Sequence, residues 1–376
     1  MSGRTGLRVL TLAALLGAAV TLSARASYQW DLPAGVEPPP VPADAAMSPA
    51  LVSLGRHLFY DTRLSGNGTQ ACATCHEQAR AFTDGRPHGI GSTGQAHTRN
   101  SMSLVNVAYA ETLTWAHPLL TSLEAQALVP MFGAAPVELG LSTTDTEWLD
   151  RLNADATYQR LTVAAFPGTT GLTLSHVTRA LAGFERSLVS MRSPYDRYHF
   201  DRDDGAISDA AKRGELLFHS RPLSCFTCHG GVHFSDSMGT RSGGRPAFHN
   251  TGLYNLAGVF SYPADDTGLY QRTGSPADVG RFKAPTLRNI AITAPYMHDG
   301  SIATLDEAIA HYEAGGRAIH DGPLRGVGHD NPGKDEGVRG FRLTDGQRAD
   351  LRAFLESLTD KALLTDARFS NPWPRR

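Results

Sequence analysis

Residues 72–76 read Cys-Ala-Thr-Cys-His, and residues 225–229 read Cys-Phe-Thr-Cys-His. These two stretches contain all four cysteines of the chain. In a C-x-x-C-H motif the two thiols form thioethers with one porphyrin, and the histidine that follows supplies the proximal nitrogen to the iron. The pattern therefore predicts two covalently attached c-type haems. The predicted haem residues are Cys72, Cys75 and His76 in the first motif, and Cys225, Cys228 and His229 in the second.

Other uses of paired cysteines explain this pattern less well. A redox-active C-x-x-C pair does not require the histidine that follows both pairs. A zinc site built from four thiols would leave both histidines unexplained and would have to join cysteines that are far apart in the sequence. A disulfide within C-x-x-C is strained and rare. Haem attachment accounts for all six residues.

The composition limits the classes of function. The chain has 376 residues, enough for two or three domains at roughly 150 residues per domain. It has 35 Lys and Arg against 37 Asp and Glu, so the net charge of -2 gives no basic excess and we expect no nucleic-acid partner. The 38 glycines and 22 prolines indicate long irregular loops.

The N-terminus indicates export. Arg4 and Arg8 precede an apolar stretch at residues 9–22, which is too short to span a bilayer. Residues 24–26 read Ala-Arg-Ala, a small-x-small cleavage site. We therefore expect a signal peptide at residues 1–26, Sec-dependent export to the periplasm, and no membrane span in the mature form. An uncleaved anchor is the alternative.

The sequence around the two motifs repeats. The segment Gly55–Phe59 precedes the first motif as Gly214–Phe218 precedes the second. Each motif is followed by a phenylalanine, a hydroxyl residue and an aspartate, at residues 82–84 and 234–236. This order is typical of a cytochrome c domain that occurs twice.

A closing helix is expected in each half, near residues 174–188 and 343–358. In the second of these, Thr344 and Gln347 form a capping box that predicts the helix start. Apolar residues recur along it at helical spacing, at Leu351, Phe354, Leu355 and Leu358.

We therefore expect a mainly α fold: two cytochrome c-like haem domains with long irregular loops. The N-terminal domain is predicted at residues 27–195 and the C-terminal domain at residues 196–376. The boundary falls in a polar segment between Ser193 and Ile207.

Two further motifs follow the second C-x-x-C-H unit. They read FKAPTLRN at residues 282–289 and APYMHDG at residues 294–300. Together with the paired haem motifs, they resemble the bacterial di-haem cytochrome c peroxidase and MauG superfamily over nearly all of the mature chain. Four short segments are similar to the MauG-like di-haem enzymes of methanobactin operons, the MbnH-like subgroup: residues 67–70, 128–133, 194–198 and 249–254.

The resemblance implies two unequal haems. The N-terminal haem on His76 would keep an open face, and the C-terminal haem on His229 would be six-coordinate. Peroxidases of the superfamily supply Met as the second ligand of the C-terminal haem, whereas MauG-like proteins supply Tyr. The corresponding position here is Tyr312, in a helix predicted to begin with the capping box of Thr304 and Glu307.

Other ligands for the C-terminal haem stay open. His311 is next to Tyr312, and a Met-ligated haem would need Met297 or Met238. A phenolate oxygen favours the higher oxidation states of iron, whereas a neutral thioether raises the reduction potential. With Tyr312 as ligand we expect a low potential and activity without prior reduction.

The resemblance also implies residues for the peroxide face. Gln126, Pro130 and Glu138 resemble the distal Gln, Pro and catalytic Glu of the superfamily. The chemistry needs a base that takes a proton from one peroxide oxygen and returns it to the other, and Glu138 is expected to do this. Glu124 is the second candidate.

Three more features follow from the resemblance. Trp115 resembles the Trp that lies between the haems and relays electrons. A calcium site is expected at Asn100, Thr293 and Pro295, whose oxygens suit this cation. His88 or His97 could cap the N-terminal haem in a resting state.

At the position where many peroxidases carry a capping His, this chain has Ser92, which favours a permanently open site.

The predicted function is that of a periplasmic di-haem c-type oxidoreductase that reacts with hydrogen peroxide. The resemblance implies two oxidising equivalents shared across both haems, a bis-Fe(IV)-type state, drawn from a docked partner protein by long-range electron transfer. The MbnH-like subgroup implies a copper-binding companion protein with a Trp oxidised to kynurenine. One alternative is a cytochrome c peroxidase served by small cytochrome donors. Another is a non-catalytic di-haem electron-transfer cytochrome.

MauG carries a Trp two residues before its second haem Cys, where this chain has Leu223. The electron exit route is therefore not evident from the sequence, and Trp30, Trp148 and Trp373 are not assigned to it.

Overall fold

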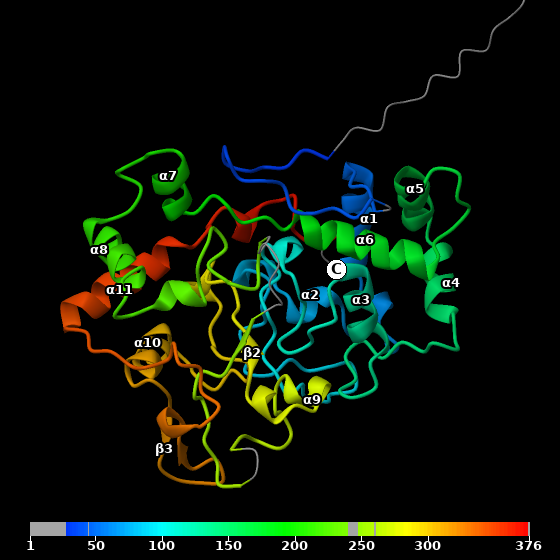
Figure 1. The fold of residues 1–376 in the computed structure, drawn as a ribbon. Coiled ribbons are helices and arrows are strands. Elements are labelled where there is room, and N and C mark those ends of the chain that lie inside the picture. The colour runs from blue at the N-terminus through cyan, green and yellow to red at the C-terminus, as the bar shows by residue number, and fades with distance from the viewer. Residues whose placement is uncertain (1–27, 44, 240–246, 259–260, 375–376) are drawn as a thin grey trace, which may run out of the picture.

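The structure is a computed structural model that describes residues 28–43, 45–239, 247–258 and 261–374. The predicted signal peptide lies outside the described residues. Within them, the chain is mainly helical, with two short antiparallel sheets and long irregular connections, as predicted (Figure 1). No helix in these ranges is long and apolar enough to cross a bilayer.

The α-helices are α1 (Pro49–Phe59), α2 (Cys72–Cys75), α3 (Leu123–Phe132), α4 (Glu147–Asn153), α5 (Ala156–Ala165), α6 (Leu174–Ser187), α7 (Pro194–Phe200), α8 (Asp209–Phe218), α9 (Tyr270–Thr273), α10 (Leu305–Glu313) and α11 (Asp345–Ser357). The strands are β1 (Phe248–His249), β2 (Phe282–Lys283), β3 (Ala318–Ile319) and β4 (Gly326–Val327). Strand β1 pairs with β2 and β3 pairs with β4, both antiparallel.

The first half is built on the crossing of α1 and α6. Helix α1 begins because the hydroxyl of Ser48 accepts a hydrogen bond from the Leu51 amide at 3.1 Å, with Pro49 in the first turn. At the crossing, a Cβ on Gly55 would lie 1.8 Å from the carbonyl oxygen of Ala180. Only glycine permits this approach of the two backbones.

The second half repeats this arrangement with α8 and α11. A Cβ on Gly214 would lie 2.0 Å from the carbonyl oxygen of Asp350. The capping box of Thr344 and Gln347 is present at the start of α11, as predicted. The predicted apolar face is buried, at Leu351, Phe354, Leu355 and Leu358.

Three phenylalanines fill the space behind each motif. The ring centroids of Phe59 and Phe184 are 5.0 Å apart in the first half, and those of Phe218 and Phe354 are 5.1 Å apart in the second. The third ring is Phe82 in the first half, 6.1 Å from Phe59, and Phe234 in the second, 6.0 Å from Phe218. The repeat of the sequence is therefore also a repeat of the packing.

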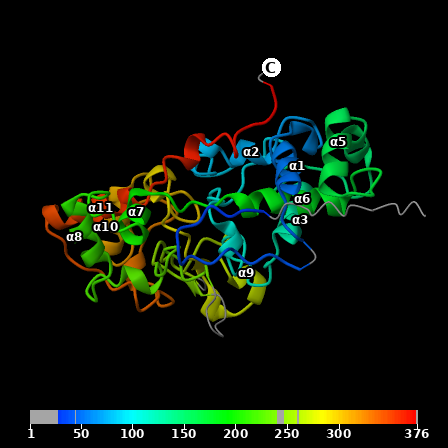
Figure 2. The same cartoon turned by 90° about the horizontal axis from the view of Figure 1, so that it is seen from above.

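The two helix groups lie at opposite ends of the molecule when it is seen from above (Figure 2). The C-terminal tail returns to the first group, where Leu363 and Phe369 are buried in its core. The indole of Trp373 donates a hydrogen bond to the His57 carbonyl at 3.1 Å. The boundary between residues 195 and 196 stays a prediction, since the tail joins the first core.

Candidate functional site

The first motif presents its histidine ring to a cavity. Helix α2 holds Cys72 and Cys75, and the Thr74 hydroxyl accepts the Ala71 amide at 3.0 Å. The Nδ1 of His76 lies 2.8 Å from the Phe82 carbonyl oxygen. Nδ1 therefore carries the ring proton and donates it, which leaves the lone pair of Nε2 for a metal.

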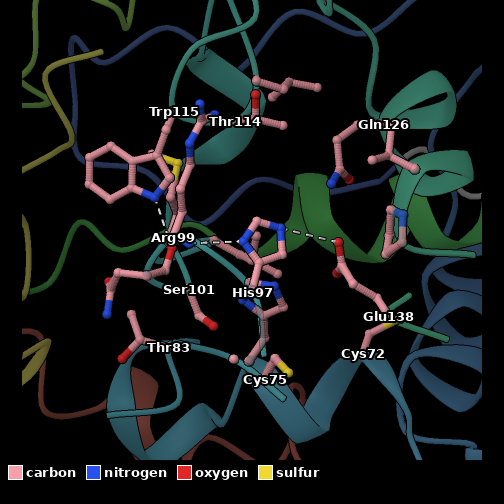
Figure 3. A pocket seen from close by; sticks show the side chains of 18 of the residues that line it. Cys72, Cys75, Thr83, His97, Arg99, Ser101, Thr114, Trp115, Gln126 and Glu138 are labelled. Carbon is pink, nitrogen blue, oxygen red and sulfur yellow. Dashed lines mark hydrogen bonds and ion pairs between the residues drawn. The ribbon is translucent and has the colours of Figure 1, made fainter. Parts of the chain in front are cut away.

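A cavity of about 630 Å³ opens above this motif (Figure 3). It borders both thiols, which are not joined in a disulfide. Paired free thiols, a histidine with an available Nε2 and a cavity of this size fit a haem. The residues predicted for the first site that line the cavity are Cys72, Cys75, His76, Trp115, Gln126, Pro130 and Glu138.

Helix α3 and the loop after it place the polar residues of this cavity. Gln126 and Pro130 lie on α3, and the Pro130 carbonyl accepts the Leu139 amide at 2.9 Å. This bond ties the segment that contains Glu138 to α3. Burial raises the pKa of the Glu138 carboxyl, as expected for an acid that exchanges protons inside a cavity.

Glu124, the second candidate for the catalytic base, is engaged in other contacts. Its carboxylate forms an ion pair with Arg186 at 2.7 Å, and it accepts a hydrogen bond from the Ser122 hydroxyl at 2.9 Å. It does not line the cavity that contains Glu138. The structure therefore favours Glu138 over Glu124.

The predicted capping residues differ in position. His97 lines the cavity, and its Nε2 lies 3.7 Å from a carboxylate oxygen of Glu138. His88 does not line it. The amide of Ser92 donates to the Glu138 carbonyl at 2.7 Å, so Ser92 supports the backbone of the predicted base.

The residues of the predicted calcium site line the same cavity as Trp115. The Trp115 indole donates to the Asn100 carbonyl at 2.8 Å. The side-chain amide nitrogen of Asn100 donates to the Arg86 carbonyl at 2.7 Å, which turns its amide oxygen away from that contact. Thr293 and Pro295 line the same cavity. The neutral oxygens present fit Ca²⁺ completed by water.

The second motif repeats the histidine geometry. The Nδ1 of His229 lies 3.2 Å from the Phe234 carbonyl oxygen, and Phe234 has a φ of 51°, as Phe82 has a φ of 63°. Left-handed backbone is uncommon for such bulky residues. In both halves it turns the carbonyl toward the ring that it orients.

Tyr312 lies beside this second motif. Helix α10 begins at the predicted capping box and carries Tyr312 in its last turn. Burial, and then the thiols of Cys228 and Cys225, raise the pKa of the Tyr312 phenol. The phenol therefore lies close enough to both thiols for their charge to affect its pKa. No hydrogen bond to its hydroxyl is formed within the described residues, which leaves the oxygen free for another partner.

The alternative ligands lie elsewhere or are engaged. His311 places its Nε2 3.1 Å from the Thr251 carbonyl, and burial lowers its pKa to about 4. Met238 and Met297 line the cavity of the first motif. The structure therefore favours Tyr312 as the residue that faces the second site.

Sequence reasoning missed a charged group beside the second motif. His249 bonds to Asp236 and Asp335, both at 2.8 Å, and its Nδ1 lies 3.7 Å from the Cys228 sulfur. Burial opposes the charge of the ring, but the bonds to its neighbours raise the pKa of His249 to about 11. Because both ring nitrogens are taken, this cluster is a bridge between loops rather than a cation site.

Two buried groups at the first cavity were also missed. Burial raises the pKa of Glu185 to about 8, and one of its oxygens has no hydrogen-bond partner in the described residues. Burial lowers the pKa of Lys283 to about 8, and its ammonium donates to the Thr112 carbonyl at 3.0 Å. The sequence did contain a signal for Glu185, because this acid lies on an otherwise apolar face of its helix.

Comparisons with known proteins agree with this geometry. Residues 49–204 match the model of the family described as di-haem cytochrome c peroxidase. The chain is 34% identical to the cytochrome-c peroxidase IdrP1 of Denitromonas iodatirespirans over 94% of this chain and 93% of that protein. It is 32% identical to the methylamine utilization protein MauG of Methylophilus methylotrophus, over 87% and 88% of the two chains.

A solved structure is more similar still. It is described as a MauG-like protein associated with microbial copper homeostasis, and it superposes with a TM-score of 0.89 at 46% identity. The match covers 93% of this chain and 100% of that one. These likenesses extend over both motifs and the helices that frame them. The chain belongs to the di-haem cytochrome c peroxidase and MauG family and is a di-haem peroxidase-type oxidoreductase.

Proposed function

We propose that this protein is an exported, periplasmic di-haem c-type enzyme that uses hydrogen peroxide to oxidise a partner protein. Each C-x-x-C-H motif would hold one haem through two thioethers and its histidine. The first haem would lie in the cavity that contains Glu138, and the second would be closed by Tyr312.

One observation carries the proposal: the two motifs share a frame but face different surroundings. The first faces a cavity with a carboxyl, an amide and an imidazole, whereas the second faces a phenol without a hydrogen-bond partner in the described residues. When bound, the haems would store the oxidising equivalents that peroxide provides. Hydrogen peroxide takes up two electrons and two protons to give two water molecules.

The side chains around the first cavity have distinct roles in this proposal. Glu138 takes the proton from one peroxide oxygen and delivers it to the departing oxygen. Gln126 orients the peroxide by hydrogen bonding from α3. Pro130 holds the Glu138 segment through its carbonyl. Trp115, buried and fixed by its bond to Asn100, would relay electrons between the two haems.

A calcium ion would support this path. Asn100 would supply its amide oxygen, and Thr293 and Pro295 their carbonyl oxygens. Because Asn100 also accepts the Trp115 indole, the ion would fix the position of that ring.

The partner that we propose is a periplasmic copper-binding companion protein, in which a Trp is oxidised to kynurenine. This four-electron oxidation consumes two equivalents of hydrogen peroxide, and hydrolysis of the formyl intermediate releases the lost carbon as formate. The support is the 46% identity to a protein described as associated with microbial copper homeostasis. Leu223 occupies the position where MauG has its exit Trp, and it is buried. Because an aliphatic side chain cannot be oxidised as an indole can, we propose that electrons enter by another route.

The deciding experiment adds one equivalent of hydrogen peroxide to the fully oxidised, haem-loaded protein and follows its absorption spectrum. We expect an immediate spectral change without prior reduction, which reverts when the copper-binding companion is added and leaves that partner oxidised. A change that requires prior one-electron reduction would instead identify a cytochrome c peroxidase. No change with either form would identify an electron carrier.

A further inference from the structure

The cavity of the first motif contains a histidine that faces Glu138. His97 and Glu138 point toward each other across it, 3.7 Å apart between Nε2 and Oε1 (Figure 3). Both side chains are about one-third exposed to the cavity, 32% for His97 and 38% for Glu138. The pair therefore borders the space where a small oxidant would react.

The backbone fixes which nitrogen of His97 faces Glu138 and which carries the proton. The Arg99 amide donates to Nδ1 at 3.0 Å. A nitrogen that accepts a hydrogen bond has no proton, so the proton of the neutral ring lies on Nε2, toward the carboxylate. Burial, and then the charge of Arg99, lower the pKa of His97 and keep the ring neutral.

The two segments that carry the pair are joined to each other. The side-chain oxygen of Gln95 accepts the Val137 amide at 2.9 Å, and the Ser92 amide donates to the Glu138 carbonyl at 2.7 Å. A Cβ on Gly91 would lie 1.8 Å from the Val137 carbonyl oxygen, so the loop can lie this close only with glycine there. The His97 loop and the Glu138 segment thus form one unit.

We propose that His97 is a positioning residue, which donates its Nε2 proton to the Glu138 carboxylate and aims the free oxygen of that carboxylate at the peroxide. This inference rests on the proposed function. A separation of 3.7 Å is too long for a hydrogen bond, and such contacts tighten when the site is loaded.

The charged surroundings are consistent with this role. Around His97 lie Arg99, which is bound to Asp266 at 2.7 Å, and His88. The titratable groups near Glu138 include His97 and the two motif thiols, which would become neutral thioethers on haem attachment. Within the described residues, His97 is the basic side chain that lies within ion-pair distance of this carboxylate.

The rival role for His97, as a cap on the first iron, predicts the opposite result. Removing a cap frees the iron and speeds the reaction with peroxide, whereas removing a positioning donor slows it. The experiment compares His97→Phe, His97→Gln, Glu138→Gln and the double variant His97→Phe/Glu138→Gln as haem-loaded proteins. His88→Gln is the matched control from the same loop.

The rate of reaction with peroxide should fall about tenfold to a hundredfold in His97→Phe, the effect of losing a hydrogen bond to a charged group. His97→Gln should retain most of the unaltered rate, because the glutamine amide nitrogen can donate in place of Nε2. In the Glu138→Gln background, His97→Phe should have no further effect. The acidic limb of the pH profile should move to higher pH in His97→Phe, because the carboxylate loses its donor.

Cyanide binding to the ferric protein gives a readout separate from turnover, because its uptake needs a proton acceptor at the same place. It should slow in His97→Phe and not in His88→Gln. A faster peroxide reaction with a changed resting spectrum, or additive effects in the double variant, would overturn the positioning role. If the unaltered protein does not react with peroxide at all, the proposed function fails, which separates the two outcomes.

Discussion

The two halves of the molecule share a frame and differ in what fills it. In each half, two helices cross at a glycine, at Gly55 and Gly214, and a phenylalanine carbonyl orients the motif histidine. The segments beyond this frame differ: a loop carries Glu138 in the first half, and helix α10 carries Tyr312 in the second. Helix packing therefore places both motifs alike, and the segments around them decide which reaction each can support.

A buried position of the closing helices shows the same divergence. Glu185 on α6 follows Phe184, as Leu355 on α11 follows Phe354. Both positions are buried, but only the first half has an acid there. The two helical frames therefore differ at this buried position, where the first half has an acid and the second an apolar side chain.

The largest expected effect removes the acid–base group of the first half. Glu138→Gln should slow the peroxide reaction about 10²-fold to 10⁴-fold, the usual contribution of proton transfer by a side chain. Stopped-flow absorption measures it. Because burial raises the pKa of Glu138, the unaltered rate should rise with pH through a value above that of an ordinary Glu. Glu124→Gln, which breaks an ion pair outside the cavity, is the control, and an unchanged rate in Glu138→Gln would remove the assigned base.

The shared frame predicts matched losses of stability. Gly55→Ala and Gly214→Ala should each lower the free energy of unfolding by about 3 kcal/mol, because the added methyl group meets a backbone carbonyl that cannot move aside. Denaturant unfolding measures both. Gly346→Ala on α11 is the control, since its nearest neighbour lies 4.0 Å away. A large loss at only one of the two crossings would show that the halves are not equivalent.

The ligand of the second half sets its potential. Tyr312→Met should raise the reduction potential of the second haem by on the order of 100 mV, because a neutral thioether replaces an anionic oxygen. Spectroelectrochemistry of the haem-loaded protein measures it. His311→Gln should leave the potential in place, since His311 is engaged with Thr251. A reduction potential that changes in His311→Gln but not in Tyr312→Met would instead identify His311 as the ligand.

The acid inside the first frame predicts a pH-dependent stability. With a pKa of about 8, Glu185 holds its proton in the folded state at pH values where the unfolded chain releases it. Stability should therefore fall as pH rises from about 5 to about 8, by about 4 kcal/mol. Glu185→Gln should remove this loss, whereas Glu356→Gln, on the exposed face of α11, should not. Equal slopes for all three proteins would show that Glu185 is not buried as a neutral acid.

Much of the frame could be predicted from the sequence because local signals determine it. The capping boxes at Thr304 and Thr344 and the apolar spacing along residues 343–358 specify helices that the structure contains. The repeat of Phe82 and Phe234 after each motif indicated equivalent packing. These signals act over a few residues, so one sequence is enough to find them.

The arrangement of the sites was less predictable, because it depends on contacts between distant loops. The pairing of His97 with Glu138 needs two loops joined by backbone bonds that leave no composition signal. The bridge that His249 forms between Asp236 and Asp335 includes a bond between residues 86 positions apart, His249 and Asp335. The placement of the C-terminal tail on the first core has the same origin.

The most direct test of the difference between the halves is a crystal structure of the haem-loaded protein in its ferric form. We predict that the Tyr312 oxygen is bonded to the iron that His229 holds. We also predict that no protein ligand lies between Glu138 and the iron above His76. A sulfur or an imidazole in place of the Tyr312 oxygen, with the phenol directed elsewhere, would contradict it.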